Sequence, residues 1–292
     1  MDWYLIAFIS AILSALAAIS QKKILFDMEA LDFSLLLSLF NAALALLLIP
    51  SIAFSEISTL SLVILYGKTI LGAIAFWFVM LAIKNLEISG ALPLMILTPA
   101  LVALSAFIIL GETISAAEIT GLGLLLIGIY VLETSSSLDI LESFKIFKTS
   151  RYKHYLIYAI ILFTISSVID KFLLKNHQLP AVSFLFFQQI FLAINFMIIF
   201  SLKSGSPISL IKSVNLKLFF WIILISLFTI GYRYSLLEAM KIAPIALVLS
   251  IKRTSIFFAA VIGGKLFSEH AVFRRGIAAL LMLAGVYLII VL

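Results

Sequence analysis

The stretch ALVLSIKRTSIFFAAVIGGKLF, residues 246–267, is apolar and long enough to cross a lipid bilayer as a helix. Lys252 and Arg253 stand side by side in its middle. An ionised side chain at bilayer depth costs at least ~2.5–3.5 kcal/mol on insertion-based scales, so such residues persist where they face water, a partner or an anionic ligand. These two cations are therefore the best indication in the sequence of what the protein handles.

Composition sets the class of protein. Of the 292 residues, 64% are hydrophobic and 12% are charged, whereas soluble domains carry about 25% charged residues. We therefore expect an all-α polytopic membrane protein. The absence of cysteine excludes disulfides and thiolate metal sites, and the three histidines lie at predicted helix ends without a metal-ligand spacing. We expect no metal, no cofactor, and a first helix that is not a cleaved signal, because Met1-Asp2-Trp3 lacks a basic N-terminal region.

The apolar runs predict ten transmembrane helices, and their continuous character argues against strands. The predicted segments are Trp3–Ser20, Phe33–Phe54, Leu62–Ile83, Ser89–Leu110, Ala116–Leu132, Tyr155–Leu174, Ser183–Leu202, Leu218–Ala239, Ala246–Phe267 and Phe273–Leu292. The longest loop, from Glu133 to Lys153, is charged and rich in serine. We predict a first five-helix repeat over residues 1–134, a polar connecting loop over 135–153, and a second five-helix repeat over 154–292.

The two halves repeat at a constant offset of 157 residues. This shift places Glu112 on Glu269 and Gly128 on Gly285. It also places Tyr130 on Tyr287, Lys84 on Lys241 and Ala82 on Ala239. Because each half holds an odd number of helices, the second copy enters the membrane from the opposite side. The sequence therefore predicts two inverted repeats, a common plan of secondary transporters whose binding site lies near the midplane.

Two segments of this repeat resemble a known family. Leu110-Gly111-Glu112 to Gly128-Ile129-Tyr130, and Phe267-Ser268-Glu269 to Gly285-Val286-Tyr287, are similar to the EamA repeat of the drug/metabolite transporter superfamily. The resemblance spans nearly the whole chain and implies two copies of five helices. It implies a transporter and leaves the substrate open, since the superfamily carries amino acids, nucleotide sugars, sugar phosphates and drugs.

Three cations are predicted to share one depth in the membrane. Arg233 lies ten residues before Ala243 in the turn Ile242-Ala243-Pro244, and Lys252 and Arg253 lie nine and ten residues after Ala243. At 1.5 Å per residue all three are about 14–15 Å from the turn. Cations at one level repel each other unless an anion joins them, so we expect either a bound anionic ligand or a water-filled cavity.

Other readings of these charges remain open at this point. Lys252 or Arg253 could pair with Glu238 or Asp170 for packing alone. Lys68 could extend its amine to the membrane interface, and Asp170 and Lys171 could pair with each other at a helix end.

The sequence Lys252-Arg253-Thr254-Ser255 resembles the Lys-Arg pair in the ninth helix of the triose-phosphate translocator branch of the same superfamily. The resemblance implies that the pair contacts a substrate phosphate. Arginine offers a planar fork and lysine a mobile point charge for such an anion. That branch also uses a lysine of the sixth helix, which makes Lys171 a further candidate. The full predicted set of substrate-binding residues is Lys252, Arg253, Arg233, Tyr232, Tyr234, Lys171, Trp77 and Gln188, and no catalytic residue is predicted.

The leading interpretation is a secondary transporter of a small organic metabolite, with an anionic substrate such as an organic phosphate or a carboxylate. Alternating access would be driven by protons or by exchange for a counter-substrate, because no nucleotide-binding P-loop is present. The rival within this class is an exporter of neutral amino acids or drugs. A flippase or accessory subunit for a polyprenyl-linked sugar phosphate is the alternative of another class. We expect no nucleic-acid partner and a monomer or homodimer in the lipid bilayer.

The basic residues predict how the chain lies in the cell membrane. Of the 20 Lys and Arg residues, thirteen fall in loops after odd-numbered helices, three on the opposite side and four inside helices. By the positive-inside rule both termini are then extracytoplasmic, whereas the resemblance implies cytoplasmic termini. A fluorescent protein that matures only in the cytoplasm is expected to stay dark when fused after Leu292. Strong fluorescence from that fusion would reverse the topology.

Overall fold

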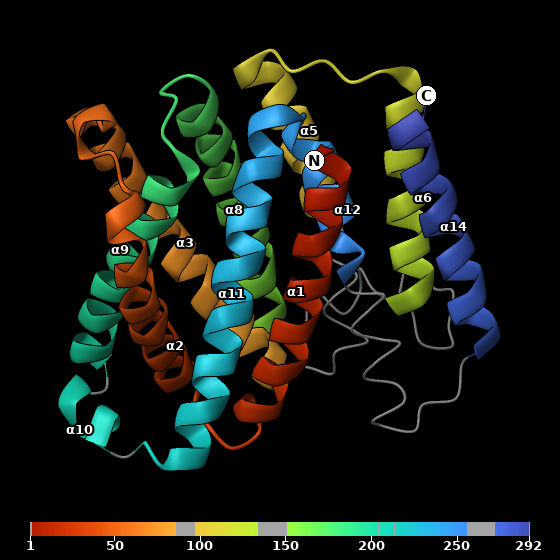
Figure 1. The fold of residues 1–292 in the computed structure, drawn as a ribbon. Coiled ribbons are helices and arrows are strands. Elements are labelled where there is room, and N and C mark those ends of the chain that lie inside the picture. The colour runs from red at the N-terminus through yellow and green to blue at the C-terminus, as the bar shows by residue number, and fades with distance from the viewer. Residues whose placement is uncertain are drawn as a thin grey trace.

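The protein is a bundle of helices (Figure 1). The structure is a computed structural model that describes residues 2–85, 97–133, 151–203, 205–212, 214–255 and 272–291. Over these ranges it holds eleven α-helices and two short 3₁₀ helices, and no strand. The α-helices are α1 Trp3–Leu25, α2 Ala30–Ala45, α3 Thr59–Asn85, α5 Leu97–Leu110, α6 Ala116–Glu133, α8 Arg151–Lys175, α9 Ala181–Lys203, α10 Pro207–Lys212, α11 Leu216–Ile242, α12 Ile245–Arg253 and α14 Val272–Val291. The all-α prediction is confirmed for this part of the chain.

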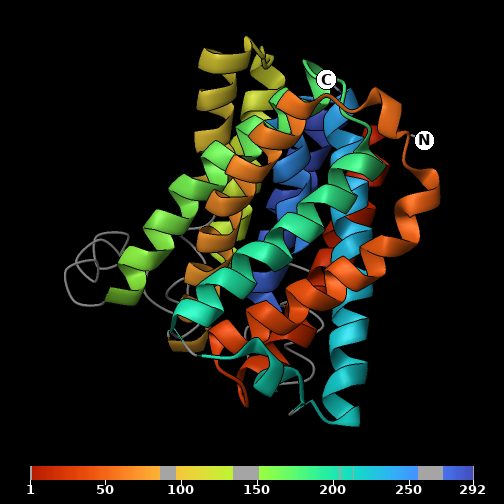
Figure 2. The ribbon, with the colours of Figure 1, turned by 90° about the vertical axis from the view of Figure 1, so that its left-hand side faces the viewer.

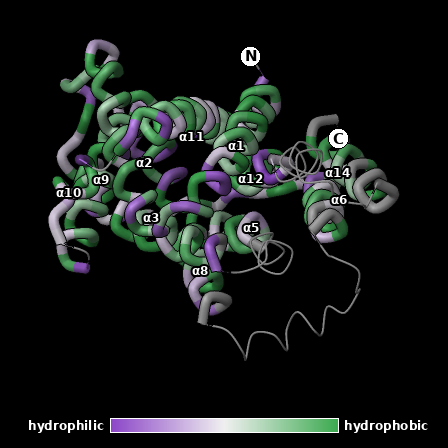
Figure 3. The backbone as a smooth tube through the Cα atoms, turned by 90° about the horizontal axis from the view of Figure 1, so that it is seen from below, coloured by the Kyte–Doolittle hydropathy of each residue, from purple (hydrophilic) through white to green (hydrophobic). Residues whose placement is uncertain are grey.

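The helices are built to lie in hydrocarbon. Among the described residues, 6 helices are long and apolar enough to span a membrane, and three shorter apolar helices accompany them. Large apolar side chains such as Phe107, Ile108 and Leu280 are exposed on the outer faces. Viewed from below, most of the backbone is hydrophobic, and hydrophilic residues interrupt the apolar helices in the middle of the bundle (Figure 3). This is a multi-pass membrane protein, because lipid tails cover the apolar surface that water would reject.

The helix bounds differ from the predicted segments where local chemistry decides them. The second segment begins at Ala30 and leaves the α conformation at Ala45, where the 3₁₀ helix Leu46–Ser51 takes over around Pro50. Proline has no N–H to continue the ladder and its ring clashes with the preceding turn. A second 3₁₀ helix, Phe54–Glu56, leads to α3. The short helix α10 was not predicted from the sequence. Three predicted features lie outside the described residues: the part of the segment Ala246–Phe267 that follows residue 255, Glu269, and most of the connecting loop 135–153.

Helices from the two halves of the chain pack in corresponding pairs. The bounds of α3, shifted by 157 residues, become 216–242, which are the bounds of α11. In sequence order α1 corresponds to α8, α2 to α9 and α6 to α14. Exchanging the halves converts the pair α1–α11 into α8–α3, and both pairs are in contact. The corresponding helices α2 and α9 also pack against each other and run side by side in Figure 2.

The pair α6–α14 depends on glycines. A Cβ atom at Gly121 would lie 2.7 Å from the carbonyl oxygen of Gly285, and one at Gly128 would lie 3.0 Å from that of Ala278. The partner residue number falls as the number on α6 rises, so the two helices are antiparallel. Under the 157-residue shift Gly121 corresponds to Ala278, and Gly128 to Gly285. The two contacts are therefore equivalent, and both bring backbone against backbone, as small residues do in membrane helices.

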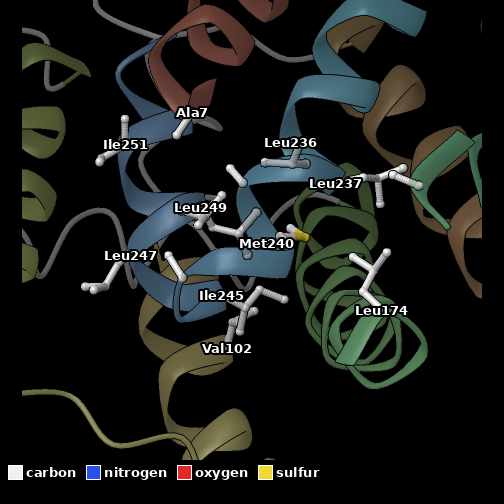
Figure 4. Packing of buried hydrophobic residues seen from close by; sticks show 14 of the residues in the cluster. Ala7, Val102, Leu174, Leu236, Leu237, Met240, Ile245, Leu247, Leu249 and Ile251 are labelled. Atoms are coloured by element: carbon white, nitrogen blue, oxygen red, sulfur yellow. The ribbon is translucent and has the colours of Figure 1, made fainter. Parts of the chain in front are cut away.

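The core surrounds α12. Every residue from Ile245 to Ile251 is buried, and this segment contacts α1, α5, α8 and α11. Figure 4 shows Ile245, Leu247, Leu249 and Ile251 packed among side chains of these neighbours. The short helix therefore ends, at Lys252 and Arg253, inside the bundle and not at its surface.

The glycine contact gives a test of the α6–α14 packing. Gly285→Ala is expected to lower stability by about 1–3 kcal/mol, because the new methyl would meet backbone atoms that have little room to shift. Gly123→Ala is the matched control on α6, since a Cβ there meets nothing within 4 Å. The control should be neutral or stabilising by up to about 1 kcal/mol, the helix-propensity difference. Melting temperatures of the purified variants in one detergent decide the matter, and equal values for both would contradict the packing.

Candidate binding cavity

A cavity of about 240 Å³ lies among the helices. Helices α1, α2, α3, α5, α8, α9, α11 and α12 all contribute side chains to its wall. The polar and charged members of the lining are Gln21, Ser34, Ser38, Asn41, Thr69, Thr98, Ser166, Ser167, Asp170, Gln188, Gln189, Thr229, Tyr232, Arg233, Lys252 and Arg253. Apolar side chains such as Phe76, Phe163 and Phe196 fill the rest. Both halves of the chain therefore build one amphipathic chamber.

Five of the eight predicted binding residues line this chamber: Tyr232, Arg233, Lys252, Arg253 and Gln188. The cause is the predicted hairpin, in which α11 ends at Ile242 and α12 begins at Ile245. The two helices run back along each other, so residues at equal distances from the turn come to one level.

The other three predicted residues lie elsewhere. Tyr234 is 41% exposed and is not part of the cavity lining. Trp77 packs with Lys203, whose Nζ lies 4.4 Å from the indole centroid, and its helix neighbour Phe76 lines the cavity in its place. Lys171 is buried at the end of the α11–α12 hairpin. These three placements favour packing roles.

Carboxylates do not neutralise the cluster of three cations. Among the described residues, none forms an ion pair with Arg233, Lys252 or Arg253. The acids that the sequence offered as partners are engaged elsewhere: Glu238 pairs with Lys241 at 3.2 Å, and Asp170 pairs with Lys68. Lys252 Nζ lies 4.9 Å from the ring centroid of Tyr232, a cation–π contact that leaves its positive charge in place. The chamber is therefore strongly electropositive.

A buried network connects one of these cations to the wall. Lys68 on α3 is only 1% exposed and forms an ion pair with Asp170 on α8. With the Gln188 amide turned so that its oxygen faces the cations, that oxygen accepts from Lys68 Nζ at 2.5 Å and from Arg233 Nη2 at 2.7 Å. Lys68 therefore does not extend to the interface, as one sequence reading allowed. It holds α3, α8 and α9 together and fixes the height of Arg233.

Lys171 and Glu112 act on the hairpin that carries the cations. Lys171 Nζ donates to the carbonyl oxygens of Met240 at 2.5 Å and Ala243 at 2.7 Å, which are the free acceptors at the end of α11. Glu112 accepts from the N–H of Ile245 at 3.1 Å, the first residue of α12. The two side chains also pair at 3.3 Å. Each charge complements a helix end, positive at the C-terminus and negative at the N-terminus. Asp170 and Lys171 thus have separate partners, which corrects the reading of a simple neighbouring pair.

Three buried side-chain oxygens in the lining have no hydrogen-bond partner among the described residues. They are the carbonyl oxygens of Asn41 and Gln189 and the hydroxyl of Thr229. The binding residues predicted from the sequence do not include them, because an amide in a membrane helix can equally bond to a neighbouring helix or line a cavity. Asn195 does the former, donating to Thr69 at 3.3 Å.

Comparison with known proteins adds one decisive observation to this geometry. Residues 1–134 match the EamA-like transporter family. This EamA match points to a membrane transporter of the drug/metabolite transporter superfamily, and it covers the residues that contribute Asn41 and Thr69 to the cavity lining. The EamA-like half was recognised from the motif around Glu112 and Gly128, and this part of the resemblance is confirmed. The likeness to the triose-phosphate translocator branch stays a prediction.

The remaining comparisons concern the fold. The chain is similar to a solved crystal structure with a TM-score of 0.72 and 15% sequence identity, over 98% of this chain and 95% of that one. At this identity the likeness shows a shared fold. No curated protein sequence matches the chain.

The Lys68–Asp170 pair predicts a large and specific effect on stability. Lys68→Met is expected to cost about 3–5 kcal/mol, because it leaves the Asp170 carboxylate buried without its partner. The double variant Lys68→Met/Asp170→Leu should recover most of this loss. Glu29→Ala, which breaks the exposed pair with Lys84, is the control and should change stability by less than about 1 kcal/mol. Thermal unfolding of the wild type and these three variants tests this, and a double variant no more stable than Lys68→Met would count against the pair.

Proposed function

We propose that the protein is a secondary transporter that moves a small organic anion, an organic phosphate or a carboxylate, across the membrane. The observation that carries this proposal is the cluster of Arg233, Lys252 and Arg253 on one cavity wall, where no described carboxylate pairs with any of them. Like charges held together in a low-dielectric site are costly, and an anion that enters between them relieves that cost. A neutral or cationic substrate would leave this electrostatic cost in place.

The composition of the cluster fits an oxyanion. An arginine presents paired N–H groups that match two oxygens of a phosphate or a carboxylate, and a lysine adds a mobile charge. Arg233 gives part of its donor capacity to Gln188 and so has a fixed orientation, whereas Lys252 stands over the Tyr232 ring. The short resemblance of Lys252-Arg253-Thr254-Ser255 to the phosphate-binding pair of the triose-phosphate translocators points the same way.

We propose that the full chain forms ten transmembrane helices in two inverted five-helix repeats. The exchange of helix pairs between the halves and the antiparallel contact of α6 with α14 support this arrangement. In such folds the binding site lies between the repeats and access alternates by movement of one repeat against the other. Here Gln188 on α9 and Asn41 on α2, which are corresponding helices, stand in the same cavity wall.

The position of the cavity suggests which side is open. Its lining includes Gln21 near the end of α1 and Ser34 near the start of α2, at the lower end of Figure 1. At the opposite end the Lys171–Glu112 pair holds the α11–α12 turn closed. With the topology inferred from the loop charges, the lower side is cytoplasmic. Alternating access then requires this turn to separate from α8, with a proton or a counter-substrate as the driving partner.

Two other functions compete with this proposal. An exporter of neutral amino acids or drugs would share the fold, but a neutral substrate would not compensate the charge of the three cations. A flippase for a polyprenyl-linked phosphate would need an apolar groove that opens from the cation cavity to the lipid. An apolar cavity does lie between α3, α5 and α8, around Ile109 and Phe172, yet its described lining shares no residue with the cation cavity. The small-anion transporter is therefore preferred.

Substitutions of the cations test the proposal. Arg253→Ala is expected to weaken anion binding by about one to two powers of ten, since a charge-assisted contact is worth ~1.5–3 kcal/mol. Arg253→Lys should also lose affinity, because an ammonium cannot offer the planar fork, and Lys252→Ala should weaken binding as well. Ligand-induced shifts of the melting temperature, measured with phosphate esters, carboxylates, neutral amino acids and amines, give the affinities.

The control is Lys217→Ala, which removes an exposed lysine at the start of α11 and should leave binding unchanged. Equal affinity of all these variants for the anion would refute the assignment of the cluster. A screen in which only amines or neutral amino acids stabilise the protein would favour the rival exporter.

A further inference from the structure

We infer that the substrate is a hydroxylated organic anion, whose hydroxyl groups bind Asn41, Gln189 and Thr229. This inference rests on the proposed anion transport and adds a second recognition element to the same cavity. These three side chains are at most 6% exposed, and their oxygens meet no partner among the described residues. A buried polar atom without a partner is costly, and their place in the cavity wall lets a ligand supply the missing hydrogen bonds.

The polar group lies within reach of the cations. Thr229 precedes Arg233 by four residues on α11, so the two share a helix face about 6 Å apart along the axis. Gln189 follows Gln188, whose oxygen contacts Arg233 Nη2 at 2.7 Å. Asn41 stands on α2, which packs against both α9 and α11. This spacing matches a two- or three-carbon chain with an anionic group at one end and hydroxyl groups beyond it.

The chemistry favours hydroxyl groups over other donors. A hydroxyl both donates and accepts, so it satisfies an amide in either orientation and also the Thr229 hydroxyl. An ammonium group would satisfy the amide oxygens, but it would lie about one helix turn from Arg233 and close to a net positive cluster. The cavity of about 240 Å³ also favours a compact molecule, because sites for drug-sized ligands usually measure about 300–1,000 Å³.

Matched ligands separate the two recognition elements. The probes are sn-glycerol 3-phosphate, n-propyl phosphate and 3-aminopropyl phosphate, which share a phosphate and a three-carbon chain and differ in what the chain carries. Glycerate and propionate form the corresponding carboxylate pair. Dissociation constants are measured on the purified full-length protein by isothermal titration or by thermal shift.

The wild-type protein is expected to bind the hydroxylated member of its preferred pair at least about ten-fold more tightly, because a polar site left unpaired rejects the analogue that lacks the hydroxyl. Gln189→Met, Asn41→Leu and the nearly isosteric Thr229→Val should each reduce this ratio towards one. Binding of the propyl or propionate analogue should change by less than about three-fold, since its contacts with the cations remain. Asn85→Leu, at an exposed asparagine that ends α3, is the matched control and should keep the wild-type ratio.

The outcomes distinguish this inference from the function on which it rests. If no phosphate ester and no carboxylate binds, anion transport itself is wrong. If both members of a pair bind equally well and the variants leave their ratio at one, anion binding stands and recognition of hydroxyl groups is wrong. Tightest binding of 3-aminopropyl phosphate would also overturn it, because the polar group would then select an ammonium. Thr229→Val keeps the shape of the side chain. If a larger substitution prevents folding, this variant still shows whether the ratio of the two dissociation constants changes.

Discussion

The cost of charge in hydrocarbon is the constraint on which the rest of this structure depends. The chain satisfies it in two ways. Lys68 and Lys171 are buried, and each has a carboxylate partner, Asp170 or Glu112. Arg233, Lys252 and Arg253 instead face a cavity. The paired lysines hold helices together, whereas the cavity cations have no carboxylate partner among the described residues. The first group of charges therefore stabilises the fold, and the second group forms the candidate binding site.

The two groups of charges are mechanically connected. Lys171 and Glu112 hold both ends of the α11–α12 turn, and this hairpin sets the level of Arg233 and Lys252. The Lys68–Asp170 pair reaches Arg233 through Gln188. An anion that draws on Arg233 therefore competes for contacts within the Gln188 network. The proposed anion binding would thus be linked to the packing of α3, α8 and α9 through shared hydrogen bonds, which is the kind of differential contact that a substrate needs to shift a conformational equilibrium.

Sequence reasoning reached the parts of this picture that depend on distance along a helix. Hydropathy placed the membrane helices, and equal spacing from Ala243 placed Arg233 and Lys252 at one level. Distance along the chain does not determine which way a helix is rotated, and so does not determine which side chains line the cavity. Tyr234 and Trp77 are next to lining residues, yet successive residues point about 100° apart, and neither reaches the cavity. The partners of Lys68 and Lys171 depended on which helices are neighbours, and the unpaired oxygens of Asn41 and Gln189 become visible only when all surrounding groups have been accounted for.

In the internal repeat that we propose, the scaffold keeps the symmetry and the binding site loses it. Correspondence is kept where backbones touch: Gly121 and Ala278, and Gly128 and Gly285, make equivalent contacts between α6 and α14. The correspondence is lost at charged positions. The 157-residue shift relates Arg233 to Phe76 and Lys68 to Ile225, so each cation has an apolar counterpart in the other half. Phe76 and Arg233 both line the cavity, so two corresponding positions give it one apolar and one cationic wall. A substrate that is anionic at one end fits such a chamber in one orientation, because only one wall can neutralise its charge.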